Sequence, residues 1–304
     1  MPFWLVLTLL AAFGQNLRSS VQKHLKGRLS TSSVTFVRFG FGWPFALLYL
    51  GLALAAGARV EAAPGAVFAL WVVLGSLTQI GAQALLIALF SLRNFAAGSA
   101  YARVEPVAAA LVAPAMLGEW VSAAAWLGIA IGAVGVLFVS ASDDLSPGAM
   151  LRALRTRAAL MGLACATLFG VSANAYRAAA LTMGAPEGAL DAILRGAATN
   201  GTAIVLQSVL LAAWLTWREP EQWRRIAAAW RPSLLVGFVG ATVSLGWFAA
   251  FSLQQAAIVK AVAQVALILA ILTSALVFRE RVRSTEIVGC ALIGLGVLVL
   301  VLLR

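Results

Sequence analysis

Polar side chains are rare within the apolar runs of this sequence, and several recur at the spacing of one helix face. Gln79 and Gln83 are four residues apart, as are Lys260 and Gln264, so each pair lies on one side of a predicted helix. Amide and ammonium groups that meet in an apolar interior suit a ligand with a carboxylate. The sequence therefore predicts a binding cavity lined by amides and cations.

Aromatic residues share some of these faces. Trp247 and Phe251 are four apart, which suits an apolar or cationic part of a ligand, although such a stripe also fits helix packing. The amides could likewise hold neighbouring helices together, at about 0.6 kcal/mol for an average interhelical hydrogen bond. The residues predicted to bind a substrate are Gln15, Asn16, Gln79, Gln83, Tyr101, Asn174, Tyr176, Arg177, Trp247, Lys260 and Gln264.

Charged residues inside the runs are mostly basic. Glu105 is the one acidic residue well inside a predicted span, where it could carry a coupling proton or pair with Arg103 or another arginine. The excess of positive charge favours a substrate with a carboxylate or phosphate. The alternative is that arginines such as Arg38 and Arg195 extend their heads towards the membrane surface.

Composition determines which elements must position these groups. The chain has 304 residues, of which 62% are apolar and 11% charged, and its mean hydropathy is +0.96. These values describe an integral membrane protein and exclude a water-soluble fold. A single His and two Cys leave little room for a metal site, and we expect no metal and no cofactor. Ten predicted transmembrane helices span residues 3–22, 33–56, 66–89, 95–117, 121–141, 158–182, 189–216, 233–254, 256–278 and 284–303.

The chain contains one stretch twice. When the sequence is shifted by 161 positions, residues 90–139 align with residues 251–300, and 16 of the 50 pairs are identical. We divide the chain into a first five-helix repeat at 1–141, a linker at 142–157 and a second five-helix repeat at 158–304. Because five is odd, the second repeat starts from the opposite side of the membrane. The fold class predicted is an all-α membrane protein of two inverted five-helix repeats, the architecture of alternating access.

Loop charges predict the orientation. One set of connections carries 14 Lys or Arg residues and the opposite set carries Arg59 and Arg304. The positive-inside rule places the first set in the cytoplasm and both termini outside, in a bacterial-type inner membrane. The first set comprises Lys23, Lys26, Arg28, Arg93, Arg152, Arg155, Arg157, Arg218, Arg224, Arg225, Arg231, Arg279, Arg281 and Arg283.

The first copy of the repeat contains Arg103-Val104-Glu105-Pro106, then Glu119, Gly128 and Gly135-Val136. This pattern resembles the EamA-type signature of the drug/metabolite transporter superfamily. The second copy keeps Arg279-Glu280 and Gly289 but has Ala266-Leu267 in place of Glu-Pro. This resemblance implies ten helices and a central cavity lined by helices 1, 3, 4, 6, 8 and 9, with helices 5 and 10 peripheral. Many members of the family keep both termini in the cytoplasm, which the loop charges here contradict.

The first function hypothesis is a secondary transporter, not an enzyme, that exports a small amphipathic or zwitterionic metabolite such as an amino acid. The alternatives are a lipid flippase on the same fold and a membrane-embedded enzyme, for which His24 is the only imidazole. We expect a small-molecule substrate and membrane lipids as partners, no nucleic acid, and a monomer or homodimer.

Overall fold

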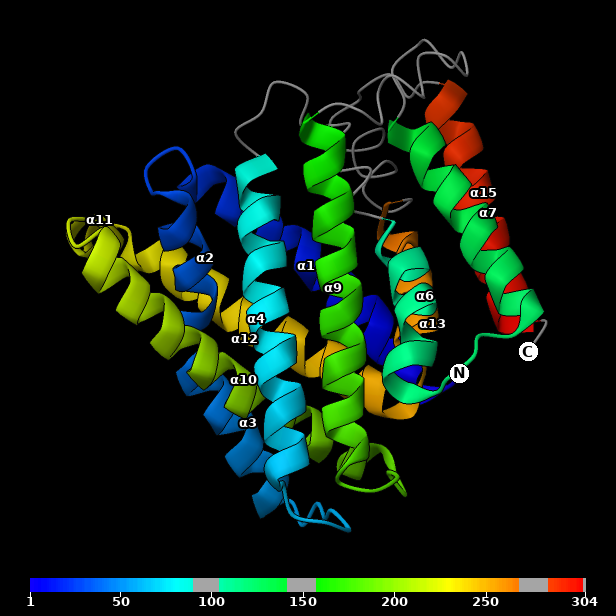
Figure 1. Ribbon diagram of the computed structural model, residues 1–304, viewed down its shortest axis with the longest axis horizontal. Coiled ribbons are helices and arrows are strands. Elements are labelled where there is room, and N and C mark those ends of the chain that lie inside the picture. Colours follow the sequence, from blue (N-terminus) through cyan, green and yellow to red (C-terminus); the bar gives the residue numbers. More distant parts are fainter. Residues whose placement is uncertain (90–103, 141–156, 268–283, 303–304) are drawn as a thin grey trace.

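The computed structural model describes residues 1–89, 104–140, 157–267 and 284–302, and these residues are helical with short connections (Figure 1). Large apolar side chains such as Leu10, Leu70 and Leu111 are 65–70% exposed on the outside of the helices. An apolar exterior of this kind requires lipid around it. The helices of the first half are α1 Phe3–Leu25, α2 Thr31–Gly40, α3 Trp43–Ala55, α4 Ala66–Leu89, α6 Glu105–Leu117 and α7 Ala123–Ser140.

The second half also has six described helices, because one long helix takes the place of α2 and α3 and one short helix is added. Its helices are α9 Arg157–Leu181, α10 Ala189–Arg218, α11 Gln222–Ala228, α12 Trp230–Leu253, α13 Ala256–Val262 and α15 Ser284–Leu302. Five described segments are long and apolar enough to cross a bilayer, namely Thr31–Ala55, Ala66–Leu89, Ala159–Leu181, Ala189–Arg218 and Trp230–Leu253. The linker 142–157, and the parts of predicted spans 4 and 9 at 95–103 and 268–278, lie almost entirely outside the described residues.

The predicted second span, 33–56, is two helices rather than one. The chain leaves the helix at Phe41-Gly42, between α2 and α3. Pro44 stands in the first turn of α3 and has no N–H to donate to the carbonyl of Gly40. A Cβ on Gly237 of α12 would lie 2.4 Å from the carbonyl carbon of Phe41, so the break coincides with a close backbone crossing.

The two halves exchange equivalent contacts with each other, and one half is inverted relative to the other. A Cβ on Gly128 of α7 would lie 2.8 Å from the carbonyl oxygen of Gly296 in α15, and one on Gly135 would lie 2.7 Å from that of Gly289. The two contacts are equivalent under the 161-residue shift. Residue 289 is the equivalent of residue 128, and residue 296 is the equivalent of residue 135, so the pair 128/296 corresponds to the pair 289/135. Equivalent helices that exchange contacts in this way run antiparallel, so the predicted inverted duplication is confirmed.

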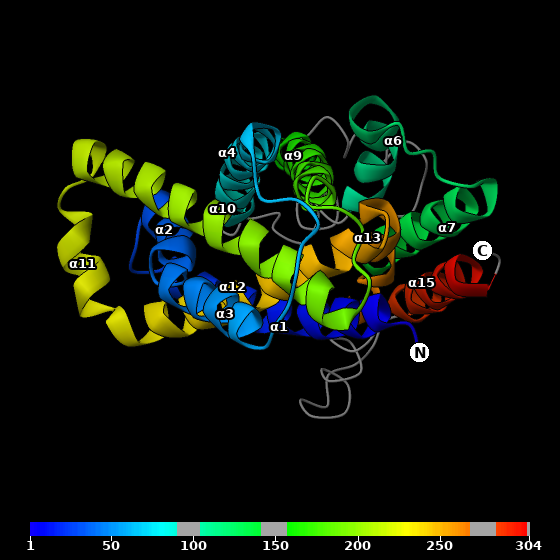
Figure 2. The ribbon, with the colours of Figure 1, turned by 90° about the horizontal axis from the view of Figure 1, so that it is seen from below.

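Other helix pairs follow the same exchange. Helix α1 packs along α12, and its equivalent α9 packs along α4, the equivalent of α12. Figure 2 shows α7 and α15 together at one end of the molecule and α11 at the other. Gly128 and Gly135 of α7 therefore allow a close helix–helix contact within the fold.

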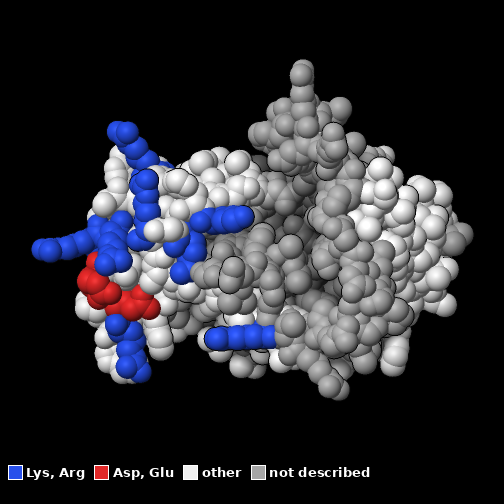
Figure 3. Space-filling model, turned by 90° about the horizontal axis from the view of Figure 1, so that it is seen from above, with Lys and Arg blue, Asp and Glu red and all other residues white. Residues whose placement is uncertain are grey.

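Basic residues gather on one face of the molecule, called the basic face here (Figure 3). The described connections of the opposite face contain one basic residue, Arg59. Six of the fourteen predicted cytoplasmic residues lie outside the described part of the chain: Arg93, Arg152, Arg155, Arg279, Arg281 and Arg283. The described members of the basic face are Lys23, Lys26, Arg28, Arg157, Arg218, Arg224, Arg225 and Arg231.

Candidate functional site

Two adjoining cavities lie between the halves. The larger, about 60 Å³, is lined from α1, α6, α12, α13 and the residues just after α13; the smaller, about 20 Å³, adds side chains from α4 and α9. Both cavities are lined by Glu105, Trp247 and Lys260. One water occupies about 30 Å³ of liquid, so together they hold only a few waters, and a metabolite requires them to open.

An ion pair between the two halves occupies the shared wall of these cavities. Lys260 Nζ lies 2.9 Å from Glu105 Oε1, and the two side chains are 10% and 13% exposed. Glu105 opens α6, and Lys260 lies in α13 of the other half. A described partner of Glu105 is thus a lysine, which the sequence did not indicate. Arg103, the partner considered from the sequence, lies outside the described residues.

Aromatic rings surround the ammonium group. Lys260 Nζ lies 4.2 Å from the centre of the Trp247 ring and 5.7 Å from that of Phe251. The indole N–H of Trp247 donates to Gln15 Oε1 at 3.2 Å, which joins α12 to α1. Cation–π contacts of this kind contribute about 0.5–2 kcal/mol depending on desolvation. The rings thus hold the ammonium in a defined place at the cavity wall.

The amide of Gln264 completes the larger cavity. Gln264 follows Lys260 by four residues, as the predicted shared face required, and is 7% exposed. A Cβ on Gly132 of α7 would lie 2.8 Å from the Oε1 atom of Gln264. The glycine of α7 therefore leaves the space in which this amide sits.

A network of amides and a phenol borders the smaller cavity. The Tyr176 hydroxyl donates to Gln79 Oε1 at 3.1 Å, and Gln207 Nε2 donates to the same oxygen at 2.8 Å and to the hydroxyl at 3.0 Å. A Cβ on Gly75 would lie 2.8 Å from the Tyr176 ring, so glycine is required there. Sequence reasoning missed Gln207, although an isolated amide in the apolar run of α10 was a usable signal.

Asn174 and Gln83, two of the predicted substrate ligands, hold helices together. Asn174 Nδ2 donates to the carbonyl oxygens of Ala109 (2.9 Å) and Gly170 (3.0 Å), which fastens α9 to α6. Gln83 is buried; its Oε1 accepts from Arg38 Nη1 at 2.6 Å, and it lines neither cavity. Asn16 is half-buried on α1 and also lines neither cavity, and Tyr101 lies outside the described residues.

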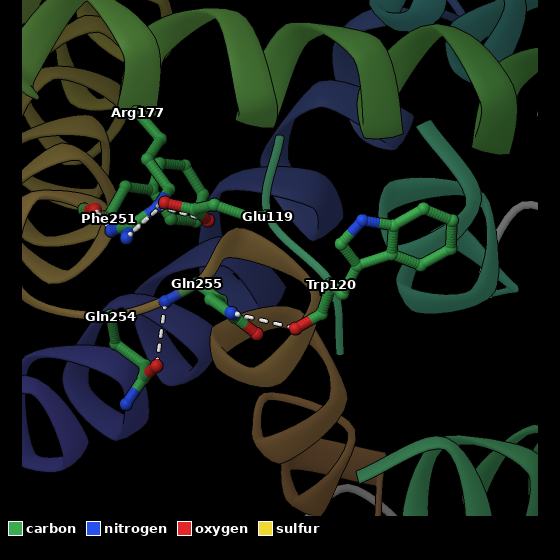
Figure 4. Close-up of polar contacts among 6 residues, drawn as sticks. All are labelled: Glu119, Trp120, Arg177, Phe251, Gln254 and Gln255. Atoms are coloured by element: carbon green, nitrogen blue, oxygen red, sulfur yellow. Dashed lines mark hydrogen bonds and ion pairs between the residues drawn. The ribbon is translucent and has the colours of Figure 1, made fainter. Parts of the chain in front are cut away.

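Arg177, also predicted to bind substrate, joins the halves beside the cavities (Figure 4). Its Nε and Nη2 donate to the Glu119 carboxylate at 2.7–3.0 Å, and its Nη1 donates to the carbonyl oxygen of Phe251. Gln255 Nε2 adds a 3.4 Å contact to the carbonyl oxygen of Trp120. Because the Phe251 side chain lines the smaller cavity, this cluster lies beside that cavity.

Glu119 is held at this position by the end of α6. Gly118 adopts φ 66°, a left-handed conformation that favours glycine, and its N–H bonds to the carbonyl of Pro114. The chain then turns out of the helix and presents Glu119 to Arg177. This partner of Glu119 was not expected from the sequence, because nothing in the spacing indicates that α9 lies beside this turn. Its repeat equivalent, Glu280, lies outside the described residues.

The cavity walls agree with the arrangement that the family resemblance implied. In the predicted numbering, α1, α4, α6, α9, α12 and α13 are helices 1, 3, 4, 6, 8 and 9, and the side chains of these helices line the two cavities. Helices α7 and α15, the predicted helices 5 and 10, pair with each other at one end of the molecule. The interior of the bundle therefore carries the polar groups that transport of a polar solute requires.

Comparisons with known proteins support the same classification. The sequence pattern of the EamA-like transporter family matches residues 2–141 and 156–302, so each half carries one family domain. No curated protein matches the chain. A solved structure described only as "Crystal structure of protein" superposes with a TM-score of 0.69 at 18% identity, covering 99% of this chain and 98% of that one, which shows a shared fold. The chain belongs to the EamA-like transporter family of the drug/metabolite transporter superfamily, and it is a secondary transporter rather than an enzyme.

Proposed function

We propose that this transporter exports a small zwitterionic or amphipathic metabolite, such as an amino acid. The observation that carries the proposal is the Lys260–Glu105 ion pair in the wall of both cavities, 2.9 Å between charged atoms. An α-amino acid carries a carboxylate and an ammonium on one carbon. Its carboxylate would pair with Lys260 and its ammonium with Glu105, so the cargo would replace one ion pair by two.

The surroundings of the pair suit the rest of such a cargo. Trp247 and Phe251 offer flat apolar surface beside Lys260, while Gln15 and Gln264 offer amides at the same wall. Specificity in a binding cavity comes from a few polar groups placed within apolar walls. A single-charge solute would leave Lys260 or Glu105 without a partner, which is costly in a low-dielectric interior.

The inverted halves support alternating access as the transport mechanism. We propose that the Arg177–Glu119 cluster is open when the cavities are accessible from the side opposite the basic face. It is closed when the cavities are accessible from the side of the basic face. The basic face would lie in the cytoplasm, which would put both termini outside, in a bacterial-type inner membrane. Labelling of cysteines introduced at both termini only from the cytoplasmic side would overturn this orientation.

Proton coupling would use Glu105, the carboxyl group that lines both described cavities. A proton on Glu105 would remove the negative charge that pairs with the cargo ammonium, so the proton and the cargo would bind in turn. A pH gradient across proteoliposomes should then drive accumulation by the wild-type protein, and Glu105→Gln should abolish that drive. Accumulation that ignores the gradient in the wild type would refute this role.

Lipid flipping is supported less well. An outward-facing groove of about 360 Å³ lies between α1, α10 and α12, but its described lining holds one hydroxyl, Thr242, and no charged side chain. Such a groove accommodates acyl chains and offers almost nothing to a charged headgroup. The polar groups that could bind a headgroup lie inside, around Lys260.

Counterflow in proteoliposomes tests the proposal. Vesicles loaded with unlabelled amino acids should take up labelled amino acid without ATP, and uptake should disappear in protein-free vesicles. Flipping of a labelled phospholipid with no exchange of any amino acid, nucleotide sugar or cationic drug would contradict it. His24→Ala should exchange normally, because His24 is exposed on the basic face.

A further inference from the structure

Two buried arginines lie one helical turn from the cavities, on the side of the basic face. Arg18 of α1 follows Gln15 by three residues, and Arg38 of α2 contacts side chains one turn beyond Gln79 and Trp247. Arg18 is 2% exposed and Arg38 is 3% exposed. Snorkelling would leave the guanidinium heads in contact with water, so it does not explain either residue.

Their donors are incompletely paired. Arg38 donates from Nη1 to Gln83 Oε1 at 2.6 Å and from Nη2 to Ser244 Oγ at 3.3 Å, while its buried Nε has no partner. Arg18 donates no hydrogen bond to any described residue, and its Nε and Nη1 are buried without a partner. The described ion pairs involve other residues, so no described carboxylate neutralises either guanidinium.

The two side chains share one space. A Cβ on Gly240 of α12 would lie 3.1 Å from Arg38 Cγ and 3.6 Å from Arg18 Cδ, so both stems pass the same glycine. Two like charges removed from water without a counter-charge are strongly unfavourable. Unpaired N–H groups on both heads could donate to an oxyanion, which guanidinium groups bind through paired hydrogen bonds.

We propose that Arg18 and Arg38 form an anion-binding site for the carboxylate of a small solute, separate from the Lys260–Glu105 site. Gln22 and Gln83 stand beside it and are bonded to each other, Gln83 Nε2 to Gln22 Oε1 at 3.4 Å. The site lies between the basic face and the cavities. It is placed to receive the anionic end of a solute that enters from the basic face. It does not depend on which metabolite the cavities carry.

Formate is the probe for this site. Purified full-length protein in phosphatidylcholine nanodiscs is unfolded thermally, followed by Trp fluorescence, while formate replaces chloride at constant ionic strength. Tm should rise saturably with formate, because a carboxylate matches guanidinium geometry and chloride does not. Arg18→Gln and Arg38→Gln should each raise the half-saturating concentration at least tenfold, while Arg59→Gln, an exposed change on the opposite face, should not. Coincident formate and chloride curves would overturn the proposal.

Two further comparisons distinguish a solute site from a structural or a lipid-binding role of the two arginines. In chloride, Arg18→Gln should be at least as stable as the wild type, because it removes an unpaired buried charge; a large loss of stability would show a structural role and overturn the proposal. The double variant Lys260→Met with Glu105→Gln should lose cargo exchange but keep the formate effect. If that variant loses the formate effect, or if phosphatidylglycerol reproduces the effect and formate does not, the proposed solute site is wrong.

Discussion

The Arg177–Glu119 pair should control access to the cavities from the side away from the basic face. Three N–H···O contacts of 2.7–3.0 Å join the two side chains, which are 11% and 20% exposed. A hydrogen bond to a charged group contributes about 1.5–3 kcal/mol when buried, and partial exposure reduces the pair to about 1–2 kcal/mol. Since 1.4 kcal/mol is a factor of ten, Glu119→Gln should raise the open population about 5- to 30-fold.

Cysteine labelling measures this population. Ala263 lines the larger cavity and is small, so Ala263→Cys in a protein without Cys165 and Cys290 gives one reporter thiol. Glu119→Gln should raise its labelling rate by a membrane-impermeant maleimide, added on the side away from the basic face, about 5- to 30-fold. Glu187→Gln, an exposed acidic residue of the α9–α10 connection, is the matched control and should leave the rate unchanged.

Exchange of the two charges provides the decisive check. The double variant Glu119→Arg with Arg177→Glu should return the labelling rate towards that of the wild type, because the pair is re-formed in reverse. An unchanged rate in Glu119→Gln, or an equal rise in Glu187→Gln, would show that this pair does not close the cavities.

Three further predictions concern the ion pair and the packing of the helices. Lys260→Met should abolish exchange in counterflow and lower the free energy of unfolding by about 2–4 kcal/mol, because Glu105 is left unpaired; adding Glu105→Gln should restore stability but not exchange. Gly128→Leu should lower the free energy of unfolding by about 3 kcal/mol or more, the upper end for overpacking, because even a Cβ there meets the backbone of α15. Gly51→Leu is the control and should be neutral in thermal unfolding, because the space around Gly51 is open. Tyr176→Phe should cost about 1 kcal/mol of stability by removing a hydroxyl from the amide network, and an unchanged Tm would argue against that network.

The repeat could be predicted in detail because it is a property of the sequence itself. The 161-residue shift, with five spans in each half, implied inversion, and the exchanged glycine contacts of α7 and α15 confirm it. The break between α2 and α3 was also predictable, since Gly42 and Pro44 both disfavour a continuous helix. It was missed because hydropathy runs unbroken through it.

The candidate site was only partly predictable. Gln15, Trp247, Lys260 and Gln264 were named from their polarity and spacing, and they line the larger cavity together. Helical spacing shows which residues share one helix face but not which faces of different helices meet. For that reason Asn174, which bonds to backbone of α6, could not be separated from the cavity residues. The same limit hid the partners of Glu105 and Arg177, which come from helices distant in sequence.

In the proposed function, Lys260 and Glu105 bind the two opposite charges of one cargo molecule. Competition in proteoliposome counterflow tests it most directly, with a labelled amino acid that exchanges and three unlabelled competitors. These are the same amino acid, its decarboxylated amine and its deaminated acid. The intact zwitterion should compete at least tenfold better than either single-charge analogue. Equal competition by an analogue that lacks one charge would contradict it.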